Sequence, residues 1–423
     1  MSRILITNAY SARNRGDAAI ILGMIESLRH QDAFPGAECL ISSTDAVADR
    51  DAYPVPVVPS FHSIKNRFSS RPAANALVFL LVLLPASLAW AGARRFLKIE
   101  LPIGGSFGEL MEAYARADLV VAAGGGYLYT TSAIRGNLVL LINVYSFFFG
   151  VLLGKPVVLY AQSIGPFAGA VQWWFVRRII SRLSLVEVRE LWSHALIEEW
   201  VAPAKLKVVA DAAFLLDPTR PATVDLAAWG GGPTVGMTVR CWFRHPGKQA
   251  AYERTMAAFV DRMVEEYGAE VVFLPQVTYI DGRDDDREVA RRVARGTAGD
   301  RVRVIEDELT APEVKWLCGC MDYFVGTRMH SNIFALSSKV PSLAIAYQPK
   351  TEGIMRALGL ADFVVPIEGL NLDELERIFA EMLRRAPEIR ERLGAVLPIL
   401  RADALEAGRL IAEVAAPAGG GSS

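Results

Sequence analysis

Residues 323–331 have the sequence Tyr-Phe-Val-Gly-Thr-Arg-Met-His-Ser, which predicts a short apolar strand, a turn and a helix that starts near Ser331. The turn carries a guanidinium, Arg328, and an imidazole, His330. In parallel α/β folds, ligands bind at the turns that follow the strands. The alternative is a structural turn whose arginine binds a nearby carboxylate and whose histidine packs in the core. Because the two side chains share one strand-to-helix turn, we favour the functional interpretation.

The sequence around this turn is short of acidic residues. From Tyr323 to Thr351 there is no Asp or Glu, whereas Arg328 and Lys350 are present. A helix N-terminus with free backbone N–H groups adds to the preference for negative charge. We therefore expect a small molecule held at this strand end to be an anion, bound by Arg328 and Lys350, with Ser331 as a further contact.

Length and composition indicate a globular protein of two domains. At 423 residues the chain exceeds what one hydrophobic core usually organises. Its 45 Lys and Arg residues nearly cancel its 46 Asp and Glu residues, which argues against a nucleic-acid binder. Since the four cysteines form no CxxC pair, we expect no metal site and a reducing, cytoplasmic compartment. The short apolar run that begins at Ile4 predicts a first strand and no signal peptide.

Apolar, strand-like runs alternate with helical patterns through both halves of the chain. Such runs, joined by helices, are typical of parallel sheets that are covered on both faces. We therefore expect an α/β protein with two facing Rossmann-like domains and ligand sites at the carboxyl ends of the strands. The expected strands are 4–7, 119–123, 157–160, 185–188, 235–239, 271–274, 323–325 and 342–346.

Turn-forming residues divide the chain into two halves. The sequence Leu-Asp-Pro-Thr-Arg-Pro at 216–221, followed by glycines from Gly230 onward, predicts the linker between domains. The expected parts are an N-terminal Rossmann-like domain over 1–215, a C-terminal Rossmann-like domain over 216–385, helices over 386–414 and a flexible tail over 415–423.

The apolar stretch 76–93 carries no charged side chain. A membrane-spanning helix needs about 20 apolar residues, and Pro85 divides this stretch into two short halves. We therefore expect an insertion, 72–98, that forms a membrane-surface hairpin or interfacial helix more readily than a span. A buried pair of core helices is the alternative. Basic flanks favour a peripheral or monotopic position at the cytoplasmic face of the inner membrane. These flanks are Arg71, Arg94, Arg95 and Lys98.

Five separated motifs occur in a definite order along the chain. They are Asn14-Arg15-Gly16-Asp17, Gly124-Gly125-Gly126, Gln162-Ser163-Ile164-Gly165-Pro166-Phe167, Val188-Arg189-Glu190 with Ser193, and Gly326-Thr327-Arg328-Met329-His330-Ser331 trailed by Tyr347-Gln348-Pro349-Lys350. Each motif alone is weak. Their order, from about Ile4 to Lys350, resembles that of the polysaccharide pyruvyl transferase family.

The resemblance implies a fold like that of the GT-B glycosyltransferases. It also implies phosphoenolpyruvate as the donor and a sugar hydroxyl pair as the acceptor, with a pyruvate ketal and phosphate as products and no cofactor. The essential arginine of the family falls on Arg189, and its essential Arg-x-His pair falls on Arg328 and His330. We expect the N-terminal domain to lie on the acceptor side and the C-terminal domain to bind the donor. The expected acceptor is a lipid-linked precursor of a bacterial polysaccharide.

The residue types in these motifs agree with that chemistry. Phosphoenolpyruvate carries a phosphate and a carboxylate, so its binding requires converging cations, for which Arg189, Arg328 and Lys350 are candidates. Ketal formation requires a proton for the methylene carbon and a base for the hydroxyl group, and an imidazole such as His330 can serve as either. Asp17 is the candidate base in the first domain, or alternatively a carboxylate that caps a helix.

Further groups near the expected strand ends are candidate ligand contacts. Gly124 and Gly125 allow the backbone to approach a ligand closely. Arg240 follows the strand at 235–239 and is either a donor contact or a surface charge. The acidic run 281–286 predicts a solvated turn and no metal loop, because its carboxylates are mostly consecutive. The remaining expected contacts are Asn14 and Gln162.

Two other functions are compatible with the same architecture. A nucleotide-sugar glycosyltransferase commonly holds the ribose with a glutamate on the helix after the strand that ends at Val325, but residues 332–338 contain no acid. A non-catalytic, membrane-associated assembly scaffold has no need of Arg189, Arg328 and His330 together. The sequence is compatible with a monomer and with a homo-oligomer.

Overall fold

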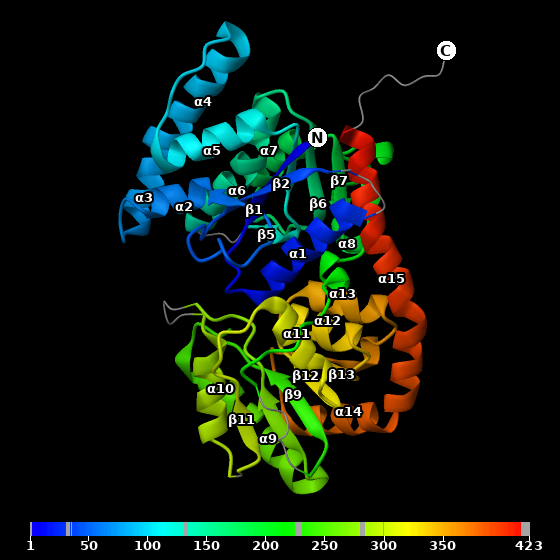
Figure 1. The fold of residues 1–423 in the computed structure, drawn as a ribbon. Coiled ribbons are helices and arrows are strands. Elements are labelled where there is room, and N and C mark those ends of the chain that lie inside the picture. The colour runs from blue at the N-terminus through cyan, green and yellow to red at the C-terminus, as the bar shows by residue number, and fades with distance from the viewer. Residues whose placement is uncertain are drawn as a thin grey trace, which may run out of the picture. The chain divides into compact units, whose positions relative to one another are not determined.

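The computed structural model describes residues 2–30, 34, 36–130, 134–224, 231–279, 284–298 and 300–415. The chain forms two compact units, each with its own parallel sheet (Figure 1). Unit 1 comprises Met1–Ala12, Ile20–Leu215 and Ala402–Ser423, and unit 2 comprises Arg13–Ala19 and Leu216–Arg401. The motif at 14–17 therefore belongs to the same unit as the turn at 326–331, whereas the expected N-terminal domain, 1–215, included it.

Unit 1 contains an eight-stranded sheet in the order β3-β2-β1-β4-β6-β7-β8, with β5 beside β6. The four strands expected in this half are confirmed, and four short strands were not anticipated. After its first residue, β1 is buried throughout, as expected for a strand covered on both faces. The strands are β1 (Arg3–Ala9), β2 (Glu38–Ser43), β3 (Val57–Pro59), β4 (Leu119–Ala122), β5 (Gly125–Leu128), β6 (Val157–Ile164), β7 (Leu185–Val188) and β8 (Leu206–Val208).

Unit 2 contains a six-stranded parallel sheet in the order β11-β10-β9-β12-β13-β14. Gly326 on β12 pairs with Thr238 on β9 and with Ala344 on β13. Three neighbouring strands therefore end at nearly the same level, which places the turns that follow them side by side. The strands are β9 (Thr234–Thr238), β10 (Glu270–Phe273), β11 (Val302–Val304), β12 (Tyr323–Gly326), β13 (Ser342–Ala346) and β14 (Val364–Pro366).

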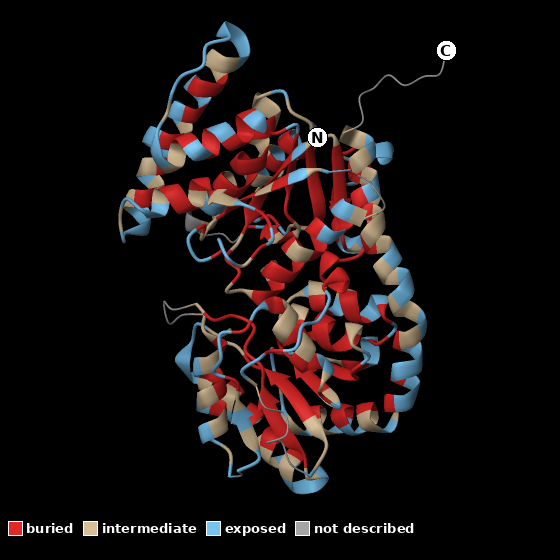
Figure 2. Cartoon of the chain, in the orientation of Figure 1, coloured by how far each residue is buried: buried red, intermediate tan, exposed pale blue. Residues whose placement is uncertain are grey.

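Helices cover the two sheets. In unit 1, α6 packs on β1, β4, β5 and β6, and in unit 2, α12 packs on β12 and β13. Figure 2 shows buried strands and helices with one exposed side, which is the pattern of a covered α/β sheet. The helices are α1 (Arg15–Arg29), α2 (Phe61–Asn66), α3 (Pro72–Val78), α4 (Leu84–Gly92), α5 (Gly105–Arg116), α6 (Ile134–Leu152), α7 (Ala170–Ile180), α8 (Leu191–Ile197), α9 (Pro246–Tyr267), α10 (Asp286–Arg295), α11 (Ala311–Gly319), α12 (Met329–Ser337), α13 (Pro349–Ala357), α14 (Leu372–Arg384) and α15 (Ala386–Ala415).

The apolar insertion forms one continuous helix of 26 residues, Pro72–Leu97. Of the two expected forms, the hairpin with a break at Pro85 is therefore wrong. A π-helical turn, Phe79–Leu83, joins α3 to α4, and a second π-helical turn, Ala93–Leu97, ends the helix. Proline lacks an N–H group and crowds the carbonyl four residues before it, and a π turn widens the helix locally. We infer that the first π turn accommodates Pro85. Among the described residues, this is the one helix long and apolar enough to cross a membrane.

Candidate functional site

The turn after β12 is fixed to the neighbouring strand β9 by hydroxyl groups. Thr238 Oγ1 accepts the backbone N–H of Thr327 at 2.9 Å and lies 2.9 Å from Ser331 Oγ. The Ser331 hydroxyl also donates to the carbonyl oxygen of Arg328 at 2.6 Å. Ser331, which we expected to contact a ligand, is therefore buried within the turn and holds its shape.

Arg328 is buried and pairs with carboxylates from a distant part of the sequence. Its Nη2 lies 2.6 Å from Asp286 Oδ1 and 3.2 Å from Asp284 Oδ1. Burial would lower the pKa of Arg328, but Asp286 outweighs this effect and the pKa is raised. The guanidinium is therefore charged and oriented before any ligand binds.

Asp286 was expected to lie in a solvated turn, and this expectation is wrong. Its side chain is buried, and one oxygen accepts the backbone N–H groups of Gln276 and Val277, each at 3.1 Å. Burial raises the pKa of Asp286, and Arg328 opposes that shift. Residues 281–283 of the acidic run lie outside the described residues. Asp286 begins α10, the first helix after the strand predicted at 271–274, and a carboxylate at such a helix start was the sequence signal that could have identified it.

Three cations act electrostatically on Tyr347, which follows β13. The guanidinium carbon of Arg240 lies 4.2 Å from the ring centroid of Tyr347 and 5.2 Å from that of Trp242. Burial would raise the pKa of Tyr347, but Lys350, Arg240 and Arg328 together lower it. Arg240, Arg328 and Lys350, which were predicted as separate ligand contacts, therefore all act on one tyrosine, and we call them the cation cluster. Trp242 was not predicted as part of the site.

Two of these guanidinium groups have unused hydrogen-bond donors. In the described part of the chain, the buried Nε atoms of Arg240 and Arg328 have no hydrogen-bond partner. Buried polar atoms are nearly always hydrogen-bonded, so such donors indicate a missing partner. An anionic group can accept a hydrogen bond from such a donor.

His330 lies in the first turn of α12 and against the start of α1. A Cβ atom built on Gly16 would lie only 2.3 Å from His330 Nδ1 and 2.9 Å from its Cβ. Only a glycine lets the two helix starts approach this closely. The Asn-Arg-Gly-Asp motif and the Arg-x-His motif, far apart in sequence, therefore form one site in unit 2.

The other residues of the N-terminal motif are ordered by hydrogen bonds. The Asn14 side chain accepts the Gly16 N–H at 3.1 Å and donates to Asp17 Oδ2 at 2.7 Å. Arg15 donates from Nη2 to Glu308 Oε2 at 2.9 Å. Asn14 therefore caps the start of α1, and Asp17 stands half-buried in the first turn of that helix.

Arg189 forms a buried cluster in unit 1. Its Nη1 lies 2.5 Å from Asp211 Oδ2, and its Nε donates to Ser163 Oγ at 2.9 Å. Burial would lower its pKa, but Asp211 and Glu190 raise it. Its Nη2 has no hydrogen-bond partner among the residues that the structure describes. Asp211 follows β8, a three-residue strand that sequence patterns do not reveal, and so this partner was missed.

The glycine and glutamine motifs of unit 1 also lie at strand ends. Gly125 pairs with Gln162 across β5 and β6, and the Gln162 side chain is fully buried. A Cβ on Gly124 would lie 3.0 Å from the carbonyl oxygen of Tyr160. The close approach at Gly124 is therefore to the backbone of the neighbouring strand.

The expected site residues thus form two groups, one in each unit. Unit 2 holds the cation cluster and the histidine, and unit 1 holds the buried arginine with the glycine and glutamine motifs. The group in unit 2 is Asn14, Asp17, Arg240, Arg328, His330, Ser331 and Lys350, and the group in unit 1 is Gly124, Gly125, Gln162 and Arg189.

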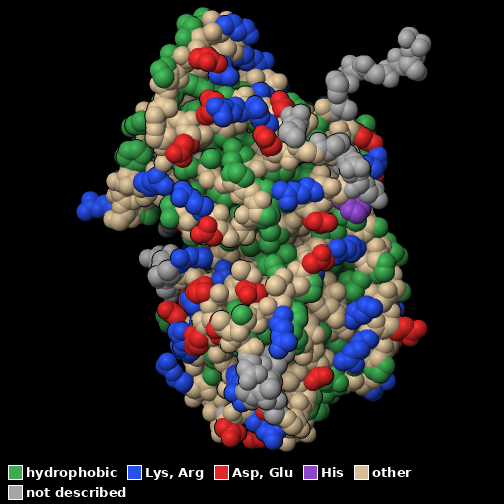
Figure 3. Space-filling model, in the orientation of Figure 1, with side chains coloured by type: hydrophobic (Ala, Val, Ile, Leu, Met, Phe, Trp, Pro, Cys, Tyr) green, Lys and Arg blue, Asp and Glu red, His purple; other side chains and the backbone are tan. Residues whose placement is uncertain are grey.

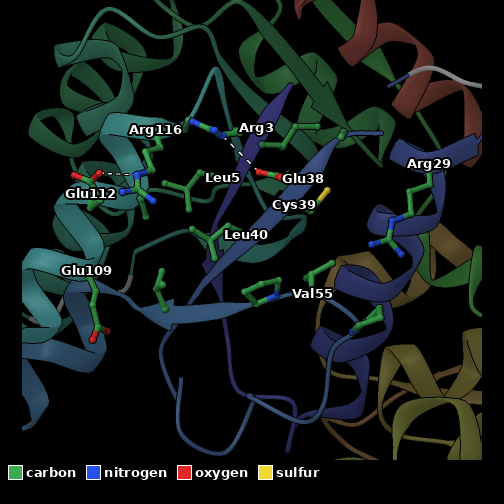
Figure 4. A pocket seen from close by; sticks show the side chains of 17 residues that line it. Arg3, Leu5, Arg29, Glu38, Cys39, Leu40, Val55, Glu109, Glu112 and Arg116 are labelled. Atoms are coloured by element: carbon green, nitrogen blue, oxygen red, sulfur yellow. Dashed lines mark hydrogen bonds and ion pairs between the residues drawn. The ribbon is translucent and has the colours of Figure 1, made fainter. Parts of the chain in front are cut away.

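A cavity of about 680 Å³ in unit 1 lies away from these residues, near the starts of β1 and β2 (Figure 4). Four of its charged lining residues form two pairs, Arg116 with Glu112 at 2.6 Å and Arg3 with Glu38 at 3.5 Å. None of the expected site residues is among the described residues that line it. In the described ranges, no group of His, Cys, Asp and Glu side chains is arranged to hold a metal ion.

Comparisons with known proteins identify the family and the fold. The amylovoran biosynthesis protein AmsJ of Erwinia amylovora is 26% identical over 399 residues, which cover 87% of this chain and 89% of AmsJ. A UDP-GlcNAc 2-epimerase from Neisseria meningitidis, bound to UDP-GlcNAc, has a TM-score of 0.58 at 11% identity, with 98% of this chain and 99% of the epimerase covered. Anabaena HepE, in complex with UDP and glucose, has a TM-score of 0.56 at 14% identity, with 98% and 99% covered. These structures confirm the expected GT-B-like α/β fold and, at such identities, nothing more. The family model of the polysaccharide pyruvyl transferases matches residues 14–349, and the chain therefore belongs to that family.

Proposed function

We propose that this protein transfers the pyruvyl group of phosphoenolpyruvate to two hydroxyl groups of a sugar in a bacterial polysaccharide precursor. The observation that carries the proposal is the cluster of Arg240, Arg328 and Lys350 around Tyr347, in a chain that belongs to the polysaccharide pyruvyl transferase family. The name of AmsJ, an amylovoran biosynthesis protein, supports a role in polysaccharide assembly.

The cation cluster suits the two anionic groups of phosphoenolpyruvate. The unpartnered Nε atoms of Arg240 and Arg328 are donors for phosphate or carboxylate oxygens, and Lys350 adds a mobile charge. The helix α12 starts at Met329, directly after Arg328, and its first N–H groups favour negative charge.

The reaction requires proton transfers that the residues of unit 2 can perform. A proton added to the methylene carbon makes C2 electrophilic, and the first sugar hydroxyl forms a C–O bond there and loses its proton. The C2–O bond to phosphate then breaks, and the second hydroxyl attacks and loses its proton. One of the two hydroxyl protons balances the proton gained by the methyl group, and the other leaves with phosphate.

We assign the proton donor for the methylene carbon to His330 and the hydroxyl base to Asp17. The His330 ring is held against Gly16, and Asp17 lies one residue beyond that glycine on the same helix. Asp17 Oδ2 accepts an N–H bond from Asn14, which orients the carboxylate. No cofactor takes part in this scheme. We further propose a lipid-linked acceptor and a position in the cytoplasm, at the inner face of the membrane.

The donor assignment predicts that phosphoenolpyruvate binds in preference to nucleotide sugars. Calorimetric titration should show phosphoenolpyruvate binding that weakens as salt rises, because salt screens charges separated by more than about 8–10 Å at 0.10–0.15 M. Inorganic phosphate serves as the control for a simple anion effect. Tight binding of a UDP-sugar without any response to phosphoenolpyruvate would identify a glycosyltransferase instead. Phosphate release together with a mass gain on a lipid-linked glycan would then establish the transfer itself.

Gly16→Ala should displace the His330 ring and lower turnover about 100-fold, since small displacements of a catalytic group have effects of this order. Phosphoenolpyruvate affinity should stay close to that of the wild type, because the cation cluster is not touched. Gly92→Ala is the matched control, since a Cβ on this helical glycine meets nothing within 4 Å. Equal turnover in both variants would show that the position of the His330 ring does not affect turnover. Steady-state kinetics of phosphate release measures the effect.

A further inference from the structure

The helix Pro72–Leu97 is apolar on two opposite faces. Its inner face packs into unit 1, where Phe79 is 0% and Trp90 is 4% exposed. The ring of Phe79 lies 6.2 Å from that of Phe61, and the ring of Trp90 lies 6.4 Å from that of Phe149. The inner face is therefore part of the core of a folded domain.

The outer face of the same helix is exposed and has no polar side chain in its central part. Leu77, Leu81 and Leu88 are 56%, 71% and 44% exposed. Figure 3 shows hydrophobic side chains along the outer edge of this helix, with Lys and Arg side chains near its end. Apolar patches this continuous mark interaction sites or membrane contacts. Other exposed apolar residues of this region are Leu80, Val82, Phe96, Leu97, Ile99 and Leu101.

The chain around this helix is basic at both ends. Between Asp51 and Glu100 there is no acidic residue. Arg71 precedes the helix and Lys98 follows it, and both are exposed. The cations of this segment are Lys65, Arg67, Arg71, Arg94, Arg95 and Lys98. Glu100 neutralises only one of them, through an ion pair with Arg94 at 3.0 Å.

We propose that Pro72–Leu97 is an in-plane membrane anchor that lies on an anionic phospholipid surface. The exposed leucines enter the boundary between headgroups and acyl chains, and the basic ends contact anionic headgroups. The helix does not span the bilayer, because Phe79, Leu83 and Trp90 are held in the core of unit 1. The inference concerns a surface and does not rest on the proposed reaction.

The charge pattern favours lipid over a second copy of the chain. Both ends of the helix are basic, so two copies packed through this face, parallel or antiparallel, would bring like charges together. An anionic bilayer has the opposite charge to the basic ends of the helix. Its acyl chains form an apolar layer in which the exposed leucines can be buried. We therefore name the membrane as the occupant of this face.

Flotation of the full-length protein with vesicles tests the proposal. The wild type should float with phosphatidylcholine vesicles that contain phosphatidylglycerol, and much less with phosphatidylcholine alone. Leu77→Glu/Leu81→Glu/Leu88→Glu should abolish flotation with both. Arg71→Glu/Lys98→Glu should weaken binding to the anionic vesicles by at least roughly 30-fold, because each cation near the surface contributes about 1 kcal/mol.

Matched controls separate the loss of vesicle binding in the leucine variant from a general effect of removing exposed apolar side chains. Val47 and Ile399 are 72% and 67% exposed and lie outside the helix, so Val47→Glu/Ile399→Glu should float as the wild type does. Unchanged thermal unfolding of the leucine variant shows that the fold is retained. Failure of the wild type to float, or flotation that the leucine substitutions do not reduce, would overturn the proposal. A wild-type dimer that the leucine substitutions dissociate, without vesicle binding, would also overturn it in favour of self-association.

Discussion

His330→Gln is expected to lower turnover by roughly 10²–10⁴-fold, the usual contribution of a general acid or base. Glutamine retains polarity and similar size but cannot transfer a proton near neutral pH. Phosphoenolpyruvate affinity should change little, because the proposed binding cations are Arg240, Arg328 and Lys350. Phosphate release under saturating donor, followed from pH 6 to 8, measures the loss.

A second histidine provides the control for this substitution. His30 lies just after the end of α1, which spans Arg15–Arg29, and so is far along the helix from Gly16. His30→Gln should leave turnover unchanged. Near-normal activity of His330→Gln across the same pH range would show that His330 is a structural residue, the alternative that the sequence left open.

Arg328→Ala is expected to weaken donor binding and to destabilise unit 2. A hydrogen bond to a charged group contributes about 1.5–3 kcal/mol, which corresponds to a loss of roughly 10- to 150-fold in affinity. The substitution also leaves Asp286, 2% exposed, without its ion-pair partner. Removal of one member of a buried pair typically destabilises a protein by about 3–5 kcal/mol. Calorimetric titration and thermal unfolding measure the two effects separately.

A double variant distinguishes a binding role from a structural one. Arg328→Ala/Asp286→Asn removes the unpaired charge, and the asparagine oxygen can still accept the N–H groups of Gln276 and Val277. Stability should therefore recover in the double variant while donor binding stays lost. Recovery of both would mean that Arg328 only neutralises Asp286.

Local pattern was sufficient to predict the regular elements of the fold. Long apolar runs such as 157–160 and 342–346 identified their strands because burial on both faces leaves a continuous apolar signature. Strands of three residues, such as β3 and β8, were missed because so short a run has no period to recognise. Pro85 was misjudged, since a π turn can accommodate a proline that would interrupt a regular α-helix.

The sequence by itself determined which chemical groups the site contains, and the tertiary structure decided which of them meet. Arg328 and His330 are neighbours along the chain, so their joint position was predictable. The pairing of Arg328 with Asp286 joins residues 42 positions apart, and Gly16 is more than 300 positions from the ring it contacts. Likewise, the helix Pro72–Leu97 is apolar all round in sequence, and only packing decided that one face is core and the other exposed. The physical reason is that backbone periodicity is a local property, whereas contacts between side chains depend on how strands and helices from distant parts of the chain assemble.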